Sequence, residues 1–303
     1  MLITFAGCGA LGSLLASRLI DSGHDVQVFQ RPGAQFDALA QNGITIKTDG
    51  IRTMYPLAGV SDDPANLAAS RLIIVLVKTY STPDIAPAQS VLTPDGIALT
   101  LQNGIGSADV LADIFGAART AAGTTTIGSY TISPGVTGLG GWGDTFIGPW
   151  ESSSDVSWIA DIFEKAEIPV SLIDDPRLAI WRKLALNAMV NTVTALTGLK
   201  VGGVGESPML LELMTHLGRE AVTAAGRAGI ALDFDSIWEH NKRNFVRTAA
   251  NKTSMLQDIE AGRKTEIDAI SGSVLNYAES DDDFPYTRTV YSLLKSIDDS
   301  RGY

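Results

Sequence analysis

The chain has 303 residues, 45% hydrophobic and 19% charged, which is enough to bury the core of one large domain or two smaller ones. Its formal net charge is −11, from 23 Lys and Arg against 34 Asp and Glu, which argues against a nucleic-acid binder and against docking to anionic lipid. One cysteine excludes an internal disulfide and a multi-cysteine zinc site, and three scattered histidines suggest no metal site, so the composition fits a cytoplasmic enzyme. We expect no signal peptide, because no basic segment precedes the apolar N-terminus, and no membrane span, because no run of 18 apolar residues occurs.

The first half of the chain alternates short apolar runs with helical patterns. Strands are expected at Leu2–Ala6, Asp25–Phe29, Leu72–Val77, Ala98–Leu101 and Ala121–Thr126. The run LIIVLV at 72–77 is apolar throughout, as in a strand buried on both faces. We therefore predict an α/β Rossmann-type, doubly wound parallel sheet over residues 1–174.

The second half has a different pattern. Residues 135–148 are rich in glycine and resemble a hairpin, and after Asp174-Asp175-Pro176 the pattern is helical almost to the end. We predict an all-α domain over residues 175–303, with no internal repeat.

Three glycines follow the first strand and open a helix: Gly7, Gly9 and Gly12 form G-x-G-x-x-G. In a dinucleotide site the first allows a tight turn, the second admits the pyrophosphate, and the third lets helix and strand pack closely. Glycines in an ordinary strand-to-helix turn could match by chance, but the strand–turn–helix context favours dinucleotide binding.

The second expected strand ends in Gln30-Arg31-Pro32, where NAD-binding folds place an acidic residue. A guanidinium suits a 2′-phosphate, so we predict NADPH/NADP+; the alternative is that Arg31 only solvates a loop. Lys78 and Asn103 follow two further strands, at the sheet edge where ligands of such folds gather. The alternative for the Asn103-Gly104 pair is an ordinary turn.

The helix predicted over 181–196 carries a second, polar stripe beside its apolar one. Lys183, Asn187 and Asn191 recur every four residues and therefore share one face. Asparagine is a mediocre helix former, so this stripe favours the wall of a polar pocket over a solvated face.

A further helix is expected from near Ser254, with Ser254 and Glu266 twelve residues apart. On a straight helix they would be roughly 18 Å apart, too far for one small substrate to contact both unless the helix bends. We therefore expect them to serve different ligands or different ends of a cofactor. Composition alone predicts Glu266 to be an ordinary surface carboxylate.

Together these segments resemble the ketopantoate reductase (2-dehydropantoate 2-reductase) family. The matching segments are GCGALG at 7–12, Arg31, Lys78, QNGIG at 102–106, GTTT at 123–126, WRKLALN at 181–187, Asn191 and SMLQDIEAGRKTEID at 254–268. The resemblance implies a Rossmann domain joined to a helical domain like that of 6-phosphogluconate dehydrogenase, with the active site in the cleft between them. It also implies NADPH-dependent reduction of ketopantoate to pantoate, on the route to pantothenate and coenzyme A.

The resemblance also implies roles for individual residues. Lys183 would be the proton donor and would bind substrate with Asn103, Asn187, Asn191 and Ser254. The implied cofactor contacts are Gly7, Cys8, Gly9, Ala10, Leu11, Gly12, Arg31, Lys78, Asn103, Ser129 and Glu266. The expected partner is a small 2-keto acid, with no metal; a homodimer is compatible with this assignment.

Three departures from the family pattern leave the 2-keto acid open. Thr192-Val193 replaces Pro-Leu, Val201-Gly202-Gly203 lacks an asparagine found in some members, and Ser271 stands where many relatives have asparagine. One alternative is an NADPH-dependent reductase of another 2-keto acid. A second is a non-catalytic NADPH-binding regulator, which would have no need for the Lys183 stripe.

Overall fold

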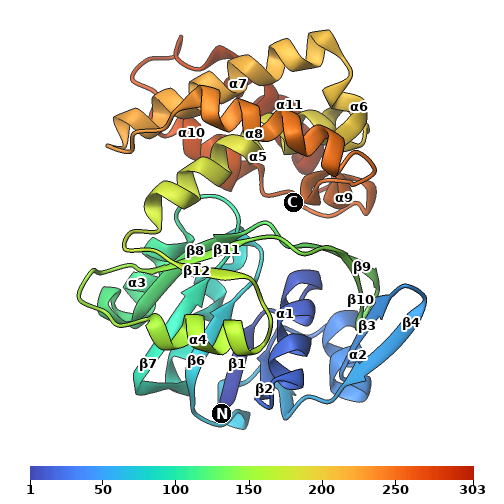
Figure 1. Cartoon of the computed structure of the whole chain (residues 1–303), viewed down its shortest axis with the longest axis vertical. Helices are drawn as coiled ribbons and strands as arrows, with labels where there is room; N and C mark the ends of the chain where they lie inside the picture. Colours follow the sequence, from blue (N-terminus) through green and yellow to red (C-terminus); the bar gives the residue numbers. More distant parts are fainter. The chain divides into compact units, whose positions relative to one another are not determined.

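The computed structural model describes all 303 residues, and the chain divides into two compact units, each of which is described by itself (Figure 1). Unit 1 comprises Met1–Gln102 and Gly106–Pro176; unit 2 comprises Asn103–Ile105 and Arg177–Tyr303. The prediction of a Rossmann-like α/β fold followed by a helical one is confirmed. No helix is both long enough and apolar enough to span a membrane.

Unit 1 is built on an eight-stranded sheet. Its strands, in spatial order, are β12 (Val170–Leu172), β11 (Thr145–Pro149), β8 (Thr120–Thr125), β7 (Leu92–Thr100), β6 (Ser70–Val75), β1 (Leu2–Ala6), β2 (Asp25–Phe29) and β5 (Gly59–Ser61). All neighbouring pairs are parallel except β8 and β11, which are antiparallel.

The apolar run at the centre of this sheet is explained by burial on both faces. Leu72 and Ile74 of β6 pack in the same cluster as helix α1 (Ala10–Asp21) and helix α4 (Ser157–Lys165). Ile73 and Val75 point the other way, into a cluster with helix α3 (Ser107–Phe115) and the 3₁₀ segment η3 (Pro83–Val91). Alternate residues of one strand therefore fill two separate cores, which a doubly wound sheet requires. Helix α2 (Ala34–Asn42) also belongs to this unit.

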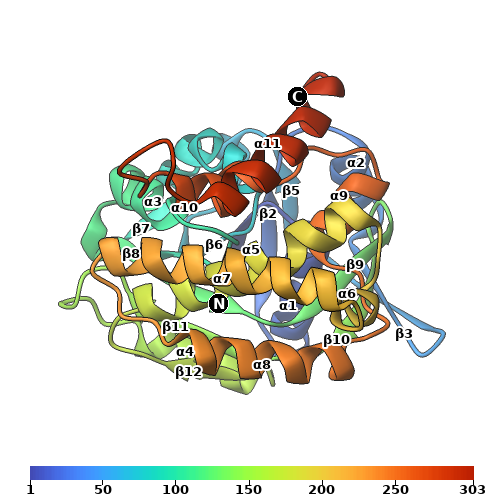
Figure 2. The ribbon, with the colours of Figure 1, turned by 90° about the horizontal axis from the view of Figure 1, so that it is seen from above.

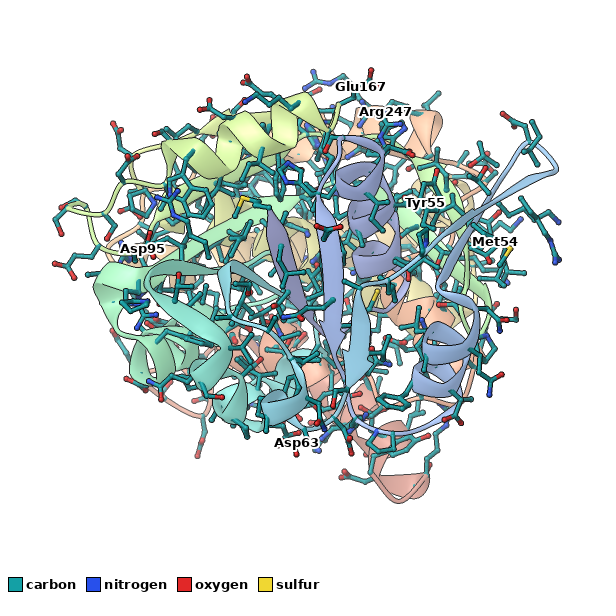
Figure 3. All side chains as sticks on the ribbon, turned by 90° about the horizontal axis from the view of Figure 1, so that it is seen from below. Met54, Tyr55, Asp63, Asp95, Glu167 and Arg247 are labelled. Carbon is teal, nitrogen blue, oxygen red and sulfur yellow. The ribbon has the colours of Figure 1, made fainter.

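A second, four-stranded sheet in unit 1 corrects the expected hairpin at 135–148. Its order is β4 (Ile51–Tyr55), β3 (Ile44–Thr48), β10 (Val136–Gly141) and β9 (Gly128–Ser133). The hairpin joins β9 to β10 at Gly135, whose φ of +73° suits glycine, whereas β11 leaves to pair with β8. Figure 3 labels Met54 and Tyr55 on the β3–β4 hairpin, on the opposite side of unit 1 from Asp95 of β7.

Unit 2 is helical, and its longest helix is central. The helices are α5 (Arg177–Thr197), α6 (Val201–Gly205), α7 (Pro208–Arg227), α8 (Phe234–Arg247), α9 (Ser254–Glu260), the π-helix η5 (Asp268–Gly272), α10 (Ser273–Leu275) and α11 (Pro285–Ser300). Helix α5 contacts α6, α7, α8, α9, α11 and η5, and α7 and α8 lie side by side (Figure 2). The stripe beginning at Trp181 supplies its buried apolar side, as predicted.

The continuous helix expected from Ser254 to Glu266 is wrong. Helix α9 ends at Glu260, and Gly262 follows with a φ of +63°. Two backbone bonds, from Gly262 N–H to Ile259 O and from Arg263 N–H to Asp258 O, form the Schellman arrangement that terminates helices. The separation of roughly 18 Å expected for a straight helix therefore does not apply to Ser254 and Glu266.

Candidate active site

The glycine loop of unit 1 uses its three glycines for three different reasons. Gly7 has a φ of +86°, and a Cβ there would lie 2.7 Å from the backbone nitrogen of Val77. A Cβ on Gly12 would approach the carbonyl oxygen of Gly7 to 3.0 Å, so this glycine permits close packing of helix and strand. A Cβ on Gly9 would meet no protein atom within 4 Å. The fold itself does not require glycine at position 9, whereas a pyrophosphate lying on the loop would.

The start of helix α1 offers free backbone donors beside this open space. Gly9 precedes the helix without a side-chain cap, and the bond from Ser13 N–H to Gly9 O is 2.8 Å. The N–H groups of Ala10, Leu11 and Gly12 are therefore available to an anion, at the positive end of the helix dipole. These residues fit the phosphates of a dinucleotide.

Two glutamines that the sequence analysis missed brace the loop at Cys8. The Cys8 N–H donates to Oε1 of Gln30 at 2.8 Å, and the Gln35 amide donates to the Cys8 carbonyl at 2.8 Å. Gln35 also accepts a bond from Gly135 N–H at 2.9 Å, which ties the loop to the second sheet. Burial raises the pKa of the Cys8 thiol to about 12, so the thiol adds no negative charge next to a bound phosphate. Nothing in the sequence around Gln30 and Gln35 indicates that their side chains hold the glycine loop.

The predicted cationic contacts follow neighbouring strands. Strands β6, β1 and β2 are adjacent and parallel, so Lys78, Gly7 and Arg31 all follow carboxyl ends at one edge of the sheet. Arg31 is exposed and Lys78 is partly buried. The structure thus brings these contacts to one edge, while Ser129 lies on β9 of the four-stranded sheet.

The loop after β7 is shared between the two units. Gln102 remains in unit 1, where its amide donates to Val77 O at 2.7 Å and to Thr82 Oγ1 at 2.9 Å. Asn103–Ile105 belongs to unit 2, where Ile105 N–H donates to the Ala269 carbonyl at 3.3 Å. Gly104 is required there, because it has a φ of +81° and a Cβ would lie 2.4 Å from the same carbonyl oxygen.

In unit 2 the predicted stripe of Lys183, Asn187 and Asn191 lies on helix α5. Asn191 is only 8% exposed, and its amide makes a long 3.4 Å bond to the hydroxyl of Ser254 at the start of α9. The Nδ2 atom of Asn187 is buried and has no hydrogen-bond partner. A buried amide left unpaired costs about 1–3 kcal/mol, so this atom fits a site that a polar ligand completes.

Glu266 joins the stripe from a different segment. The expectation of an ordinary surface carboxylate is wrong, because Glu266 is only 7% exposed. It accepts a bond from the Asn103 amide at 3.3 Å, and its charge acts on Lys183. Burial lowers the pKa of the Lys183 ammonium from 10.5 to about 8, and the Glu266 carboxylate opposes part of this shift. Lys183, with a pKa of about 8, is thus influenced by the buried carboxylate of Glu266 and shares a helix face with two asparagine amides. Such a combination of groups is typical of proton-transfer sites.

Comparison with known proteins identifies the family. Residues 3–152 match the family described as "Ketopantoate reductase PanE/ApbA", and residues 175–298 match its C-terminal counterpart. The chain belongs to the ketopantoate reductase family. A protein of Halobacterium salinarum named 2-dehydropantoate 2-reductase is 30% identical over 298 residues, covering 97% of this chain and 98% of the relative. One of Shigella flexneri with the same name is 31% identical, covering 92% and 89%. The chain is accordingly an oxidoreductase that acts on a keto or hydroxyl group.

Solved structures show the same fold. A PanE/ApbA family ketopantoate reductase from Ralstonia eutropha superposes with a TM-score of 0.89 at 26% identity, with both chains covered completely. A D-mandelate dehydrogenase in complex with NADH and anilino(oxo)acetate gives a TM-score of 0.92 at 22% identity, again over the full length of both. At that identity the second likeness concerns the fold alone.

Proposed function

We propose that this enzyme reduces 2-dehydropantoate (ketopantoate) to pantoate with NADPH, as a step toward pantothenate and coenzyme A, and that Lys183 is the proton donor. The observation that carries the proposal is Lys183 itself, an amine on α5 whose pKa burial lowers to about 8, with Glu266 acting on it and Asn187 one turn away. The names of the full-length relatives support the substrate.

The assignment of NADPH rests on two features of unit 1. The open space at Gly9 and the free N–H groups of residues 10–12 suit a pyrophosphate. Arg31, exposed just beyond β2 where an NAD-binding fold would carry an acid, offers a planar fork to a 2′-phosphate. When bound, NADPH supplies the hydride.

Lys183 has two tasks in this scheme. Negative charge develops on the carbonyl oxygen of the keto acid as the carbon is reduced, and a nearby ammonium stabilises that charge. The same ammonium then delivers its proton to the oxygen, leaving a neutral amine that solvent reprotonates. A pKa of about 8 suits this exchange, because an acid with a pKa near the working pH both holds and releases its proton.

The amides and the hydroxyl bind the rest of the substrate. We assign the substrate carboxylate to Asn187, Asn191 and Ser254, which donate hydrogen bonds without adding charge. Asn103 is already oriented by its bond to Glu266, and we assign it to both cofactor and substrate. In this proposal residues 1–174 bind the nucleotide and also supply Asn103, and residues 175–303 supply Lys183 and the other substrate-binding groups.

The first experiment follows NADPH oxidation by absorbance, with ketopantoate beside pyruvate, 2-ketoisovalerate and oxaloacetate. Turnover confined to ketopantoate is the expected result. Turnover confined to another acid would keep the chemistry and replace the substrate, in line with the departures at Thr192-Val193, at residues 201–203 and at Ser271. Tight NADPH binding without turnover of any acid would refute the enzymatic proposal in favour of a regulator.

A further inference from the structure

The segment that carries Glu266 is held by a buried carboxylate at the far end of the chain. Asp298 of α11 is 0% exposed, and its carboxylate accepts bonds from Thr265 N–H at 3.2 and 3.1 Å and from the Thr265 hydroxyl at 2.8 Å. The Thr265 hydroxyl accepts in turn from Ile267 N–H at 3.3 Å. The backbone is therefore fixed on both sides of Glu266.

No Lys or Arg side chain pairs with Asp298. The nearby Lys295 is paired with Asp268 at 3.7 Å and Asp299 at 3.2 Å, and Arg301 donates to the carbonyl of Ile259. A buried carboxylate without a cation depends on hydrogen-bond donors for its stability, and the side-chain partner of Asp298 is Thr265. Burying the Asp298 carboxylate costs desolvation energy, and its hydrogen bonds hold the short segment around Thr265 in place.

The same segment is held at its other end by the Asn103 loop. The π-helix η5 begins two residues after Glu266, and the Glu266 carbonyl accepts from Ala269 and Ile270 N–H. Gly104 is packed against Ala269, so the loop at 103–105 is in close contact with η5. π-Helical turns are rare and occur often at functional sites.

We propose that Asp298 is a positioning residue of the active site: through Thr265 it fixes the Glu266 carboxylate where it meets Lys183 and Asn103. This inference rests on the proposed function of Lys183 and Glu266. Lys183 lies on α5 and Glu266 on the segment between α9 and η5, and the charge of Glu266 acts on Lys183. A loosened Glu266 therefore acts on Lys183 in a known direction, because losing a nearby negative charge lowers the pKa of an ammonium.

The test titrates Lys183 directly in the protein without cofactor or substrate. Lysines labelled with ¹³C next to the amine report their protonation by NMR, and the Lys183→Arg variant identifies the Lys183 signal. Glu266→Gln gives the shift expected when the charge is lost completely. A carboxylate that moves about 1 Å farther from an ammonium loses about a fifth of their attraction, which lowers the midpoint by roughly half a pH unit.

We call the hydrogen bonds between Asp298 and Thr265 the clamp. Two variants remove bonds of the clamp, and two serve as controls. Thr265→Val and Asp298→Asn each remove hydrogen bonds at nearly constant volume, and both are expected to lower the Lys183 midpoint by roughly half a unit. Thr265→Ser keeps the hydroxyl and is expected to restore the wild-type midpoint. Thr287→Val is the matched control on α11, because Thr287 is fully buried but its hydroxyl has no partner to lose.

An unchanged midpoint in both clamp variants, with a clear shift in Glu266→Gln, would overturn the inference. If Thr265→Val fails to fold, Asp298→Asn decides alone, and thermal melting of Thr287→Val shows how much of any loss belongs to α11. The amount of enzyme that binds NADPH, measured by its fluorescence, separates misfolding from misplacement. Because the titration needs no substrate, a shift without turnover of any keto acid would refute the proposed function and leave the clamp standing.

Discussion

The lowered pKa of Lys183 predicts how turnover depends on pH. If Lys183 is the proton donor, as proposed above, the protonated amine is the active form for reduction of the ketone, and kcat is expected to fall as pH rises through about 8. The reverse reaction, oxidation of the hydroxy acid, needs the neutral amine as base, and its rate is expected to rise through the same pH. An ordinary lysine would give neither change below about pH 10.

The size of the effect follows from the titration of one group. With a pKa of about 8, about nine-tenths of Lys183 is protonated at pH 7 and about one-tenth at pH 9, so the reductive rate falls about tenfold between them. The shift from 10.5 corresponds to roughly 3 kcal/mol against the charged form, caused mainly by burial. Glu266→Gln removes the charge that opposes this shift. In this variant the fall of the reductive rate with rising pH is therefore expected at a lower pH than in the wild type.

The assay is NADPH oxidation at saturating keto acid from pH 6 to pH 10, with the hydroxy acid and NADP+ for the reverse direction. Lys183→Arg keeps a permanent cation and is expected to be slow and to lose the limb near pH 8. Arg182→Ala is the matched control, because Arg182 is exposed and adjacent on the same helix, and its profile is expected to follow the wild type. A reductive limb that persists near pH 8 in Lys183→Arg would refute the assignment of Lys183 as the acid.

Three further predictions concern binding and stability. Arg31→Ala is expected to raise the KM for NADPH about tenfold or more while leaving that for NADH nearly unchanged; an unaltered preference would refute the 2′-phosphate contact. Gly9→Ala is expected to weaken NADPH binding without lowering Tm, whereas Gly7→Ala, with its φ of +86° and its close approach to Val77, is expected to lower Tm by several degrees; equal melting of the two would contradict the argument. Asn187→Leu removes an unpaired buried amide, so Tm is expected to stay level or rise while the KM for the keto acid increases; an unchanged or lower KM would exclude Asn187 from the substrate site.

The parts of the fold that could be predicted from sequence are those where local pattern and tertiary packing agree. LIIVLV predicts a strand buried on both faces, and the structure places its alternate residues in two cores. The stripe of Lys183, Asn187 and Asn191 can be predicted from the four-residue spacing of a helix alone, and all three residues lie on α5. The glycine motif likewise combines a strand end, a turn and a helix start in twelve residues.

The expectations that fail concern features whose local signal is a single residue or is absent. Glycine commonly terminates helices, and Gly262 is the local signal that α9 ends before Glu266. Glu266 accepts a bond from Asn103, 163 residues earlier, and its neighbour Thr265 is bonded to Asp298, 33 residues later, so neither contact could be found from spacing. The same holds for Gln30 and Gln35, whose roles appear only when strand β2 lies beside β1.

The assignment of Asn103–Ile105 to unit 2 has a consequence for dissecting or recombining the two units. The chain enters unit 2 at Asn103, returns at Gly106 and enters it again at Arg177, so a cut at residue 176 does not separate them cleanly. A fragment ending there would carry a tripeptide whose partner, Ala269, is missing. In a chimera that joins the first 176 residues of a relative to this helical unit, a foreign loop would meet the native turn at Ala269. Recombinants of this family should therefore inherit residues 103–105 and 265–272 from the same parent.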